Sequence, residues 1–210
     1  MEKIEADNII HIIGPQAKIG FGNACAEPQT LTDTFIKNRD RFEVIEIYGM
    51  IHYWTEQFVK HNLGERFRLK VFMVDRFTVE GIKNGYTEYI PCRYSEIPEL
   101  FLKGYIRLDV ALISVSAPDA NGNCSYGVSS DFTMAMAKSA KTVIAEVNHQ
   151  MPWVYGENFI HINDIDFAFE TDRPLPQVYP EKFTELDRQV GGYASQLIED
   201  GATIQIGLGR

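Results

Sequence analysis

The sequence predicts an α/β fold whose sheet is mainly parallel and is covered by helices on both faces. Short apolar and β-branched runs alternate with segments long enough for crossover helices, which is typical of parallel strands. Two runs, LDVALISV and TVIAEV, are apolar at nearly every position, as central strands buried on both faces are. The predicted strands cover residues 17–22, 42–48, 68–74, 108–115 and 142–147.

Three helices are predicted from their amino ends. Pro28 suits the first turn of a helix in which Leu31 and Phe35 lie four residues apart. Ser95 can cap the segment SEIPELFLKG and Asp131 can cap DFTMAMAKSAK, because their side-chain oxygens accept hydrogen bonds from the free amides of a first turn.

Composition and charge disfavour several classes of protein. The chain has 210 residues, of which 45% are hydrophobic, enough for at least one sizeable core. A net charge of −9 and a pI near 5.0 disfavour nucleic acid as a partner. There is no run of about 18 apolar residues, and residues 1–10 lack the pattern of a signal peptide. We therefore expect a cytoplasmic protein without a membrane segment.

The cysteines and histidines show no pattern of a disulfide framework or a metal site. The three cysteines, Cys25, Cys92 and Cys124, stand far apart without a CxxC pair, and we expect them to be reduced. The five histidines show neither HxxxH nor HExxH spacing. We expect no metal, and a site assembled from distant histidines is the less favoured alternative.

A proline-rich segment divides the chain. Residues 171–180, TDRPLPQVYP, hold three prolines, which suit an extended connector. The predicted organisation is a domain over residues 1–170, a linker over 171–180, and the start of a second domain over 181–210. This last part is expected to form a helix over 181–199 and a strand from Ala202 to Leu208.

The end of the chain repeats its beginning at a constant offset of 187 positions, the separation of Gly20 and Gly207. Gly14 matches Gly201, and Gly22 matches Gly209. Both copies read as helix, glycine, strand and GxG, which favours the start of a second α/β unit. A coincidental terminal strand remains the alternative.

The first GxG, at Gly20 and Gly22, lies where a strand is predicted to enter a helix. Backbone amides at such a turn can face an anion or a developing oxyanion. Cys25 occupies the place of a third glycine, which weakens a dinucleotide-site interpretation. A tight turn without a ligand is the alternative.

The loop over residues 114–132 follows the strongest predicted strand, and loops at the carboxyl ends of parallel strands bind ligands. It offers polar atoms from Ser116, Asp119, Ser129 and Ser130. A serine hydrolase is disfavoured, because GxSxG is absent and no histidine has a triad spacing.

Glu146 lies inside a predicted apolar strand, where an unpaired carboxylate would be costly. It is a tempting nucleophile. We favour a structural role, in which the acid lies at the strand end and pairs with a loop.

With these motifs placed, the sequence resembles the acetyl-CoA hydrolase/transferase family, most closely its 4-hydroxybutyrate CoA-transferase members. The resemblance is carried by GFGNACAEPQTL, GYTEYIPCRYSEIPELF, LDVALISVSAPDANGNCSYGVSSD, KTVIAEVNHQMPWVYG and DGATIQIGLG. It implies two similar open α/β halves with the active site between them, this chain being the first half and the beginning of the second. It also implies a nucleophilic glutamate in the second half, together with most of the CoA site. No residue here matches that glutamate, so neither Glu27 nor Glu146 takes its role and no catalytic residue is assigned.

The resemblance implies that this half supplies a wall that holds the acyl or carboxylate group. The substrate-binding residues expected there are Gly20, Gly22, Asn23, Gln29, His52, Ser116 and Gln150.

The function implied is transfer of CoA between a short acyl-CoA and a small carboxylate, such as 4-hydroxybutyrate or acetate, through a glutamyl-CoA intermediate. CoA is then a substrate, and no cofactor is expected. The expected partners are these substrates, a carboxyl-terminal domain and further copies in a homo-oligomer. An acyl-CoA hydrolase of the same family and a non-catalytic nucleotide- or anion-binding module are the alternatives.

Overall fold

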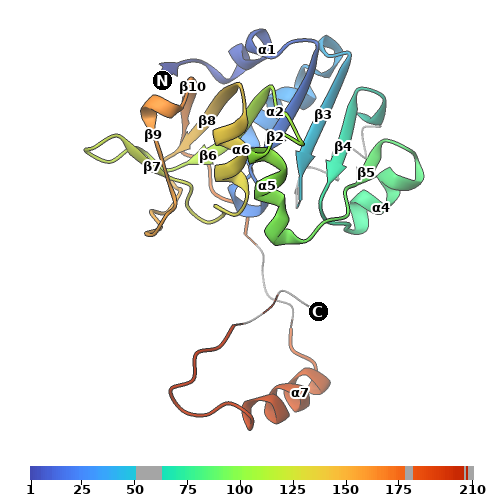
Figure 1. Ribbon diagram of the computed structural model, residues 1–210, viewed down its shortest axis with the longest axis vertical. Helices are drawn as coiled ribbons and strands as arrows, with labels where there is room; N and C mark the ends of the chain where they lie inside the picture. Colours follow the sequence, from blue (N-terminus) through green and yellow to red (C-terminus); the bar gives the residue numbers. More distant parts are fainter. Residues whose placement is uncertain (51–62, 178–181, 206, 208–210) are drawn as a thin grey trace. The chain divides into compact units, whose positions relative to one another are not determined.

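The computed structural model describes residues 1–50, 63–177, 182–205 and 207 (Figure 1). The chain divides into two compact units, Met1–Pro176 and Gln177–Arg210. The division falls inside the segment 171–180.

The first unit is built on an eight-stranded sheet in which every neighbouring pair is parallel. The strand order is β1-β10-β8-β6-β2-β3-β4-β5. The strands are β1 (Glu2–Lys3), β2 (Gln16–Phe21), β3 (Val44–Gly49), β4 (Phe67–Val71), β5 (Thr87–Tyr89), β6 (Val110–Val115), β8 (Thr142–Asn148) and β10 (Phe167–Thr171). A small antiparallel pair joins β7 (Asn123–Ser125) to β9 (Phe159–His161).

The predicted α/β fold with a mainly parallel sheet is confirmed. The five predicted strands correspond to β2, β3, β4, β6 and β8, with ends that differ by up to three residues. The sheet is wider than predicted, because β1, β5 and β10 extend its edges. Two of these three strands have only two or three residues, too few to show an alternating pattern in the sequence.

Helices cover both faces of this sheet (Figure 1). On one face, α1 (Ile9–Ile12) and α2 (Gln29–Lys37) pack Ile9, Leu31 and Phe35 into a core that includes Phe21 of β2. On the other face, α5 (Ile97–Leu102) and α6 (Thr133–Ser139) contribute side chains such as Phe101 and Met136 to a second core. Another helix, α4 (Arg76–Lys83), contacts β5.

The helix starts differ from the predicted ones in detail. Pro28 is the residue that precedes α2 rather than part of its first turn. Ser95 does not cap α5, because it lies within a 3-10 turn, Tyr94–Glu96, that precedes this helix. Asp131 lies one residue before Phe132, the N-cap of α6, and its Oδ1 still accepts a hydrogen bond of 2.9 Å from the N–H of Thr133, the first residue of this helix.

The strand order reverses direction between β2 and β6. From β2 the chain proceeds outward through β3, β4 and β5, and it then returns to place β6 on the other side of β2, followed by β8 and β10. At such a point the loops after two neighbouring strands run to opposite faces of the sheet. A crevice then forms at the carboxyl ends of these strands, and open α/β sheets bind ligands there. The predicted GxG turn follows β2, and the predicted loop 114–132 follows β6.

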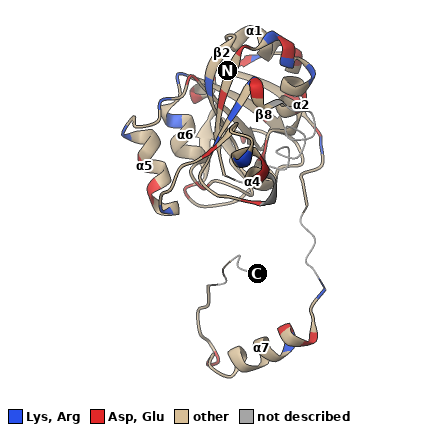
Figure 2. Cartoon of the chain, turned by 90° about the vertical axis from the view of Figure 1, so that its right-hand side faces the viewer, with Lys and Arg blue, Asp and Glu red and all other residues tan. Residues whose placement is uncertain are grey.

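The second unit contains α7 (Glu185–Ser195), which is shorter than the predicted helix over 181–199. Thr184 fixes its start, because its hydroxyl accepts from the N–H of Asp187, whose carboxylate accepts from the N–H of Thr184. Figure 2 shows that the charged residues of α7 lie towards one end. The predicted strand from Ala202 to Leu208 is wrong for its described residues, 202–205 and 207. A strand needs a hydrogen-bonded neighbour, and the described residues of this unit offer none, because they contain no strand.

Candidate functional site

The turn over residues 22–28 lies at the carboxyl end of β2, at the point where the strand order reverses. The N–H of Gly22 donates to the carbonyl of Leu112 on β6 at 2.8 Å. A Cβ at Gly22 would lie 2.9 Å from the carbonyl oxygen of Ala26, so a larger residue would force the turn open. The sequence predicted this turn, and the close approach of its backbone explains the glycine.

Ala24 has a backbone φ of +48°, in the left-handed region that L-residues rarely adopt. Such a conformation is unfavourable by about 1–2 kcal/mol and persists only where neighbouring contacts impose it. No signal in the sequence marks Ala24, because the residue usually found at such a φ is glycine. The turn is therefore held in shape by its surroundings.

Asn23 fixes one side of the turn. Its side chain is buried, and its Nδ2 donates to Asp131 Oδ2 at 3.0 Å. The same carboxylate accepts from the hydroxyl of Ser129 at 2.6 Å and from the N–H of Thr133. The predicted substrate-binding residue Asn23 thus joins the turn after β2 to the loop that precedes α6.

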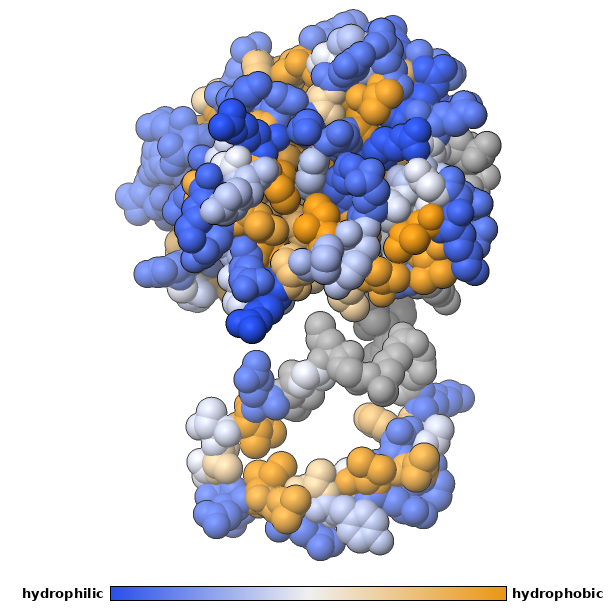
Figure 3. Space-filling model, turned by 45° about the vertical axis from the view of Figure 1, so that its right-hand side comes forward, coloured by the Kyte–Doolittle hydropathy of each residue, from blue (hydrophilic) through white to orange (hydrophobic). Residues whose placement is uncertain are grey.

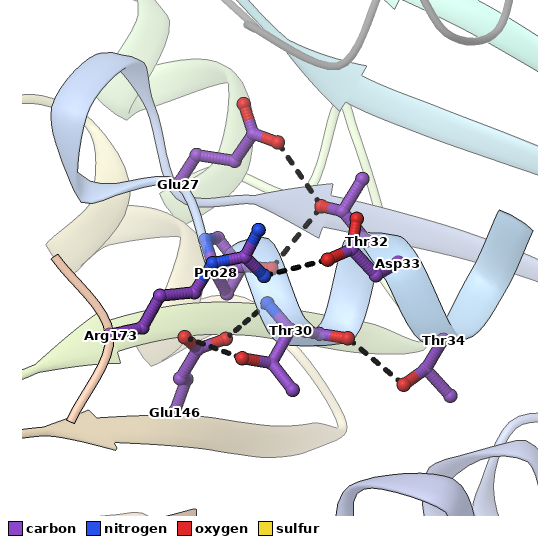
Figure 4. A network of polar contacts seen from close by, with 8 residues as sticks. All are labelled: Glu27, Pro28, Thr30, Thr32, Asp33, Thr34, Glu146 and Arg173. Carbon is purple, nitrogen blue, oxygen red and sulfur yellow. Dashed lines mark hydrogen bonds and ion pairs between the residues drawn. The ribbon is translucent and has the colours of Figure 1, made fainter. Parts of the chain in front are cut away.

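Glu146 fixes the other side, at the start of α2 (Figure 4). The Thr30 N–H donates to its Oε2 at 3.0 Å, and the Thr30 hydroxyl donates to its Oε1 at 3.1 Å. Burial raises the pKa of Glu146 to about 7, against the lowering effect of hydrogen bonds from Thr30 and Leu31 and of the Arg173 charge. The carboxylate of Glu146 therefore has a structural role, as predicted. The contact differs from the predicted one, because Glu146 lies within β8 and bonds to the start of a helix, whereas an acid at the strand end that pairs with a loop was expected.

A second buried carboxylate, Glu27, belongs to the turn itself. Its Oε1 accepts from the hydroxyl of Thr32 at 3.2 Å. Figure 4 shows the side chains of Glu27 and Glu146 on opposite sides of the first turn of α2. The helix start between them therefore contacts an acid from its own loop and an acid from a distant strand.

The other predicted site residues have distinct positions. Gly20 lies within β2, where a Cβ would collide with the Met136 sulfur of α6, so it allows this helix to pack closely. Ser116 follows β6 and is buried, and its hydroxyl donates to the carbonyl of Ala117 and accepts from the N–H of Ser125. Gln150 follows β8, and its Nε2 donates to the carbonyl of Asp172 at 2.9 Å.

The structure thus places Gly22, Asn23, Ser116 and Gln150 after the carboxyl ends of three neighbouring strands, β2, β6 and β8. Gln29 begins α2, on the chain that continues from the same turn. The remaining predicted residue, His52, lies outside the described residues.

Other kinds of site receive no support from the described residues. They contain no group of three or more His, Cys, Asp or Glu side chains that could hold a metal ion. None of the three cysteines forms a disulfide, and Cys124 alone among them is fully buried. No helix in the described ranges combines the length and apolarity needed to cross a bilayer.

Comparison with known families decides what this architecture belongs to. The model of the acetyl-CoA hydrolase/transferase N-terminal domain matches residues 1–179. The chain belongs to this family. It is 38% identical over 206 residues to the 4-hydroxybutyrate coenzyme A transferase of Clostridium kluyveri, an alignment that covers 98% of this chain and 48% of the relative.

Solved structures of similar proteins agree with the fold. RipA from Yersinia pestis has a TM-score of 0.90 and 25% identity, covering 99% of this chain and 51% of that one. A 4-hydroxybutyrate CoA-transferase from Porphyromonas gingivalis has a TM-score of 0.76 and 33% identity, covering 98% and 48%. The chain spans about half the length of the curated relatives that it matches.

Proposed function

We propose that this chain is the amino-terminal part of a CoA-transferase that moves CoA between a short acyl-CoA and a small carboxylate, such as 4-hydroxybutyrate or acetate. The observation that carries the proposal is the constrained turn 22–28 at the reversal of the strand order, in a chain of this family. The relatives named as transferases of 4-hydroxybutyrate, butyryl and succinyl substrates favour transfer to a carboxylate over transfer to water.

The proposed reaction uses a glutamate that lies outside residues 1–210. Its carboxylate attacks the thioester carbonyl and expels CoA thiolate, which leaves an acyl–glutamyl anhydride. The thiolate then attacks the glutamyl carbonyl, releases the first carboxylate and forms glutamyl-CoA. An incoming carboxylate reverses these two steps and leaves as the new acyl-CoA. CoA is a substrate throughout, and the proposal needs no resident cofactor.

In this proposal, the present chain holds the acyl or carboxylate group. Each step develops negative charge on an acyl oxygen, and losing one preorganised N–H donor aimed at such an oxygen typically costs about 2.7–4 kcal/mol. The turn 22–28 lies near the ends of β2 and β6, and the proposal assigns it to the part of the wall that faces the acyl oxygen. The N–H of Gly22 is not a donor to substrate, because it donates to the carbonyl of Leu112. Gln29, Ser116 and Gln150 contribute polar side chains to the proposed wall. The proposal also includes His52 and Gly20 in this wall.

The test is an assay of the complete protein with acetyl-CoA and a set of small carboxylates. We expect ping-pong kinetics and, without an acceptor, a protein-bound CoA thioester detectable by mass spectrometry. Residues 1–210 alone are expected to be inactive, and turnover by them would contradict the position of the nucleophile. Release of free CoA without an acceptor would favour a hydrolase. Tight nucleotide binding without turnover would favour a binding module.

The proposed protein also forms homo-oligomers, which the family resemblance favours. Sedimentation of the complete protein tests this separately from the chemistry. A monomer with full activity would contradict it.

A further inference from the structure

Helix α2 begins without a side-chain cap of its own. Pro28 precedes it and makes no such hydrogen bond. The amides of a first helical turn need acceptors from elsewhere. Glu146 supplies them for Thr30, through a hydrogen bond of 3.0 Å, and for the backbone of Leu31. A carboxylate 116 residues away in the chain therefore does what a local cap usually does.

The strand that carries Glu146 is a rigid support. Residue Glu146 pairs with Ser114 on β6 and with Phe169 on β10, so β8 is hydrogen-bonded on both sides at this position. The Glu146 side chain is only 2% exposed, which leaves its carboxylate no room to turn towards water. The start of α2 is thereby fixed to the centre of the sheet.

The same contact limits the turn 22–28. This segment is bounded by Gly22, whose N–H is bonded to β6, and by Thr30, which is bonded to Glu146. Between these points Ala24 keeps its unfavourable φ. If the bond to Glu146 is lost, the segment can relax towards ordinary backbone angles. The backbone of the turn would then lose its fixed shape.

We propose that Glu146 is a positioning residue, whose carboxylate sets the turn 22–28 for substrate by holding the start of α2. The effect on substrate rests on the proposed function, whereas the contact between Glu146 and the start of α2 is seen in the structure. Glu146 acts through Thr30 and Leu31 and does not itself touch substrate. The charged groups near it are Arg173, after β10, and Asp33 of α2, which form an ion pair of 2.7 Å with each other.

Three variants separate the contact from general stability. Glu146→Ala removes both hydrogen bonds to Thr30. Glu146→Gln keeps them in neutral form, because its oxygen can accept from the Thr30 N–H while its amide donates to the Thr30 hydroxyl, which can rotate. Thr30→Val removes one bond and leaves Glu146 in place. Glu170→Gln, on the neighbouring strand β10, is the matched control, since Glu170 is half-exposed and pairs with Lys3.

The first measurement is hydrogen exchange of the 1–210 chain by NMR. In Glu146→Ala we expect the amides of Thr30, Leu31 and residues 22–27 to exchange about ten- to a hundredfold faster than in the unchanged chain. Glu146→Gln and the control should stay near the unchanged rates, and Thr30→Val should lie between. Unchanged exchange at 22–27 in both Glu146→Ala and Thr30→Val would overturn the positioning role, whatever the activity.

The second measurement is steady-state kinetics of the complete protein. We expect Thr30→Val to raise KM for the carboxylate by about tenfold, as loss of one hydrogen bond predicts. Glu146→Ala, which loses both bonds, should raise KM at least as much, and Glu146→Gln should restore it. A purely structural role would lower the folded fraction and kcat together and leave KM unchanged. Faster exchange with unchanged KM would overturn the link to substrate. An inactive unchanged protein would instead overturn the proposed function. Should Glu146→Ala not fold, Thr30→Val and Glu146→Gln give the same two comparisons.

Discussion

Helices α2 and α7 carry similar apolar stripes, but they differ in whether the stripe is buried and in which residues fix the first turn. In α2, Leu31 and Phe35 are fully buried, and the helix start depends on the distant Glu146. In α7, Leu186 is 68% exposed and Val190 is 59% exposed. The start of α7 is fixed by Thr184 and a residue three positions later. Figure 3 shows apolar side chains at the surface of this second unit.

The difference teaches that one helix is a product of tertiary contacts and the other of local sequence. An apolar stripe gains about 1.5–3 kcal/mol for each large side chain that it buries, and nothing where the side chain stays in water. A capping box forms without any partner.

The largest expected effect comes from the same substitution in each helix. Leu31→Ala in α2 should lower the free energy of unfolding by about 2–5 kcal/mol, because it leaves a cavity in the core. Leu186→Ala in α7 should change it by less than about 0.5 kcal/mol, since this side chain is exposed. Urea unfolding followed by tryptophan fluorescence measures both. Equal losses would contradict the contrast between the two helices.

The next effect concerns pH and the two helix starts. The pKa of Glu146 rises from 4.5 to about 7 in the folded chain, mainly through burial, which corresponds to about 3 kcal/mol. Because the fold favours the protonated acid, this contribution is complete below pH 4.5 and is lost as the pH rises through about 7. The ion pair of 2.7 Å between Arg173 and Asp33 lies beside Glu146 (Figure 4).

Glu146→Gln should therefore gain stability relative to the unchanged chain as the pH rises from about 4.5 to 8. Unfolding by urea at several pH values in this range measures the difference between the two chains. Asp187→Asn, at the exposed start of α7, serves as the control and should give a flat difference. A flat difference for Glu146→Gln as well would contradict the buried, proton-favouring environment.

Local patterns explain what the sequence could predict, and distant contacts explain what it could not. The long apolar runs identified β6 and β8, because a strand buried on both faces needs no partner information to be recognised. The GxG turn was also predicted from a local pattern, because glycine marks the close backbone approach at Gly22. The bond between Glu146 and Thr30 has no local pattern, because the two residues meet only after β8 enters the sheet.

Two expectations about the second unit failed for a related reason. The predicted helix over 181–199 followed its apolar stripe, but the structure begins α7 at Glu185, where the local cap allows it. The predicted strand from Ala202 followed its β-branched residues, although a strand also needs a neighbour. Periodicity therefore predicted the type of the first element and not its limits.

A smaller effect is expected at Ala24, the non-glycine residue with a left-handed φ among the described residues. Ala24→Gly should stabilise the chain slightly, by up to about 1 kcal/mol, because glycine adopts a positive φ without strain. Ala26→Gly, two residues later in the same turn, should destabilise it by about 1 kcal/mol, since Ala26 is buried and has an ordinary φ. Thermal unfolding of both variants measures the pair. Destabilisation of equal size would mean that Ala24 is not strained.

The smallest effect on the first unit is expected from removing the second. The described parts of α2 and its core lie within Met1–Pro176, and the segment after β10 is held there as far as Arg173, whose carbonyl accepts from Asn148. We therefore expect a chain ending at Tyr179 to unfold at the same temperature as 1–210.

Removing the second unit should change self-association much more than it changes the unfolding temperature. Burying even two of Leu186, Val190, Tyr193 and Leu197 against another copy is worth about 3–6 kcal/mol, enough to drive self-association of 1–210. Sedimentation should show that 1–210 associates and that 1–179 is a monomer. A monomeric 1–210 together with an unfolded 1–179 would show that the second unit supports the first, and the contrast between α2 and α7 would then be wrong.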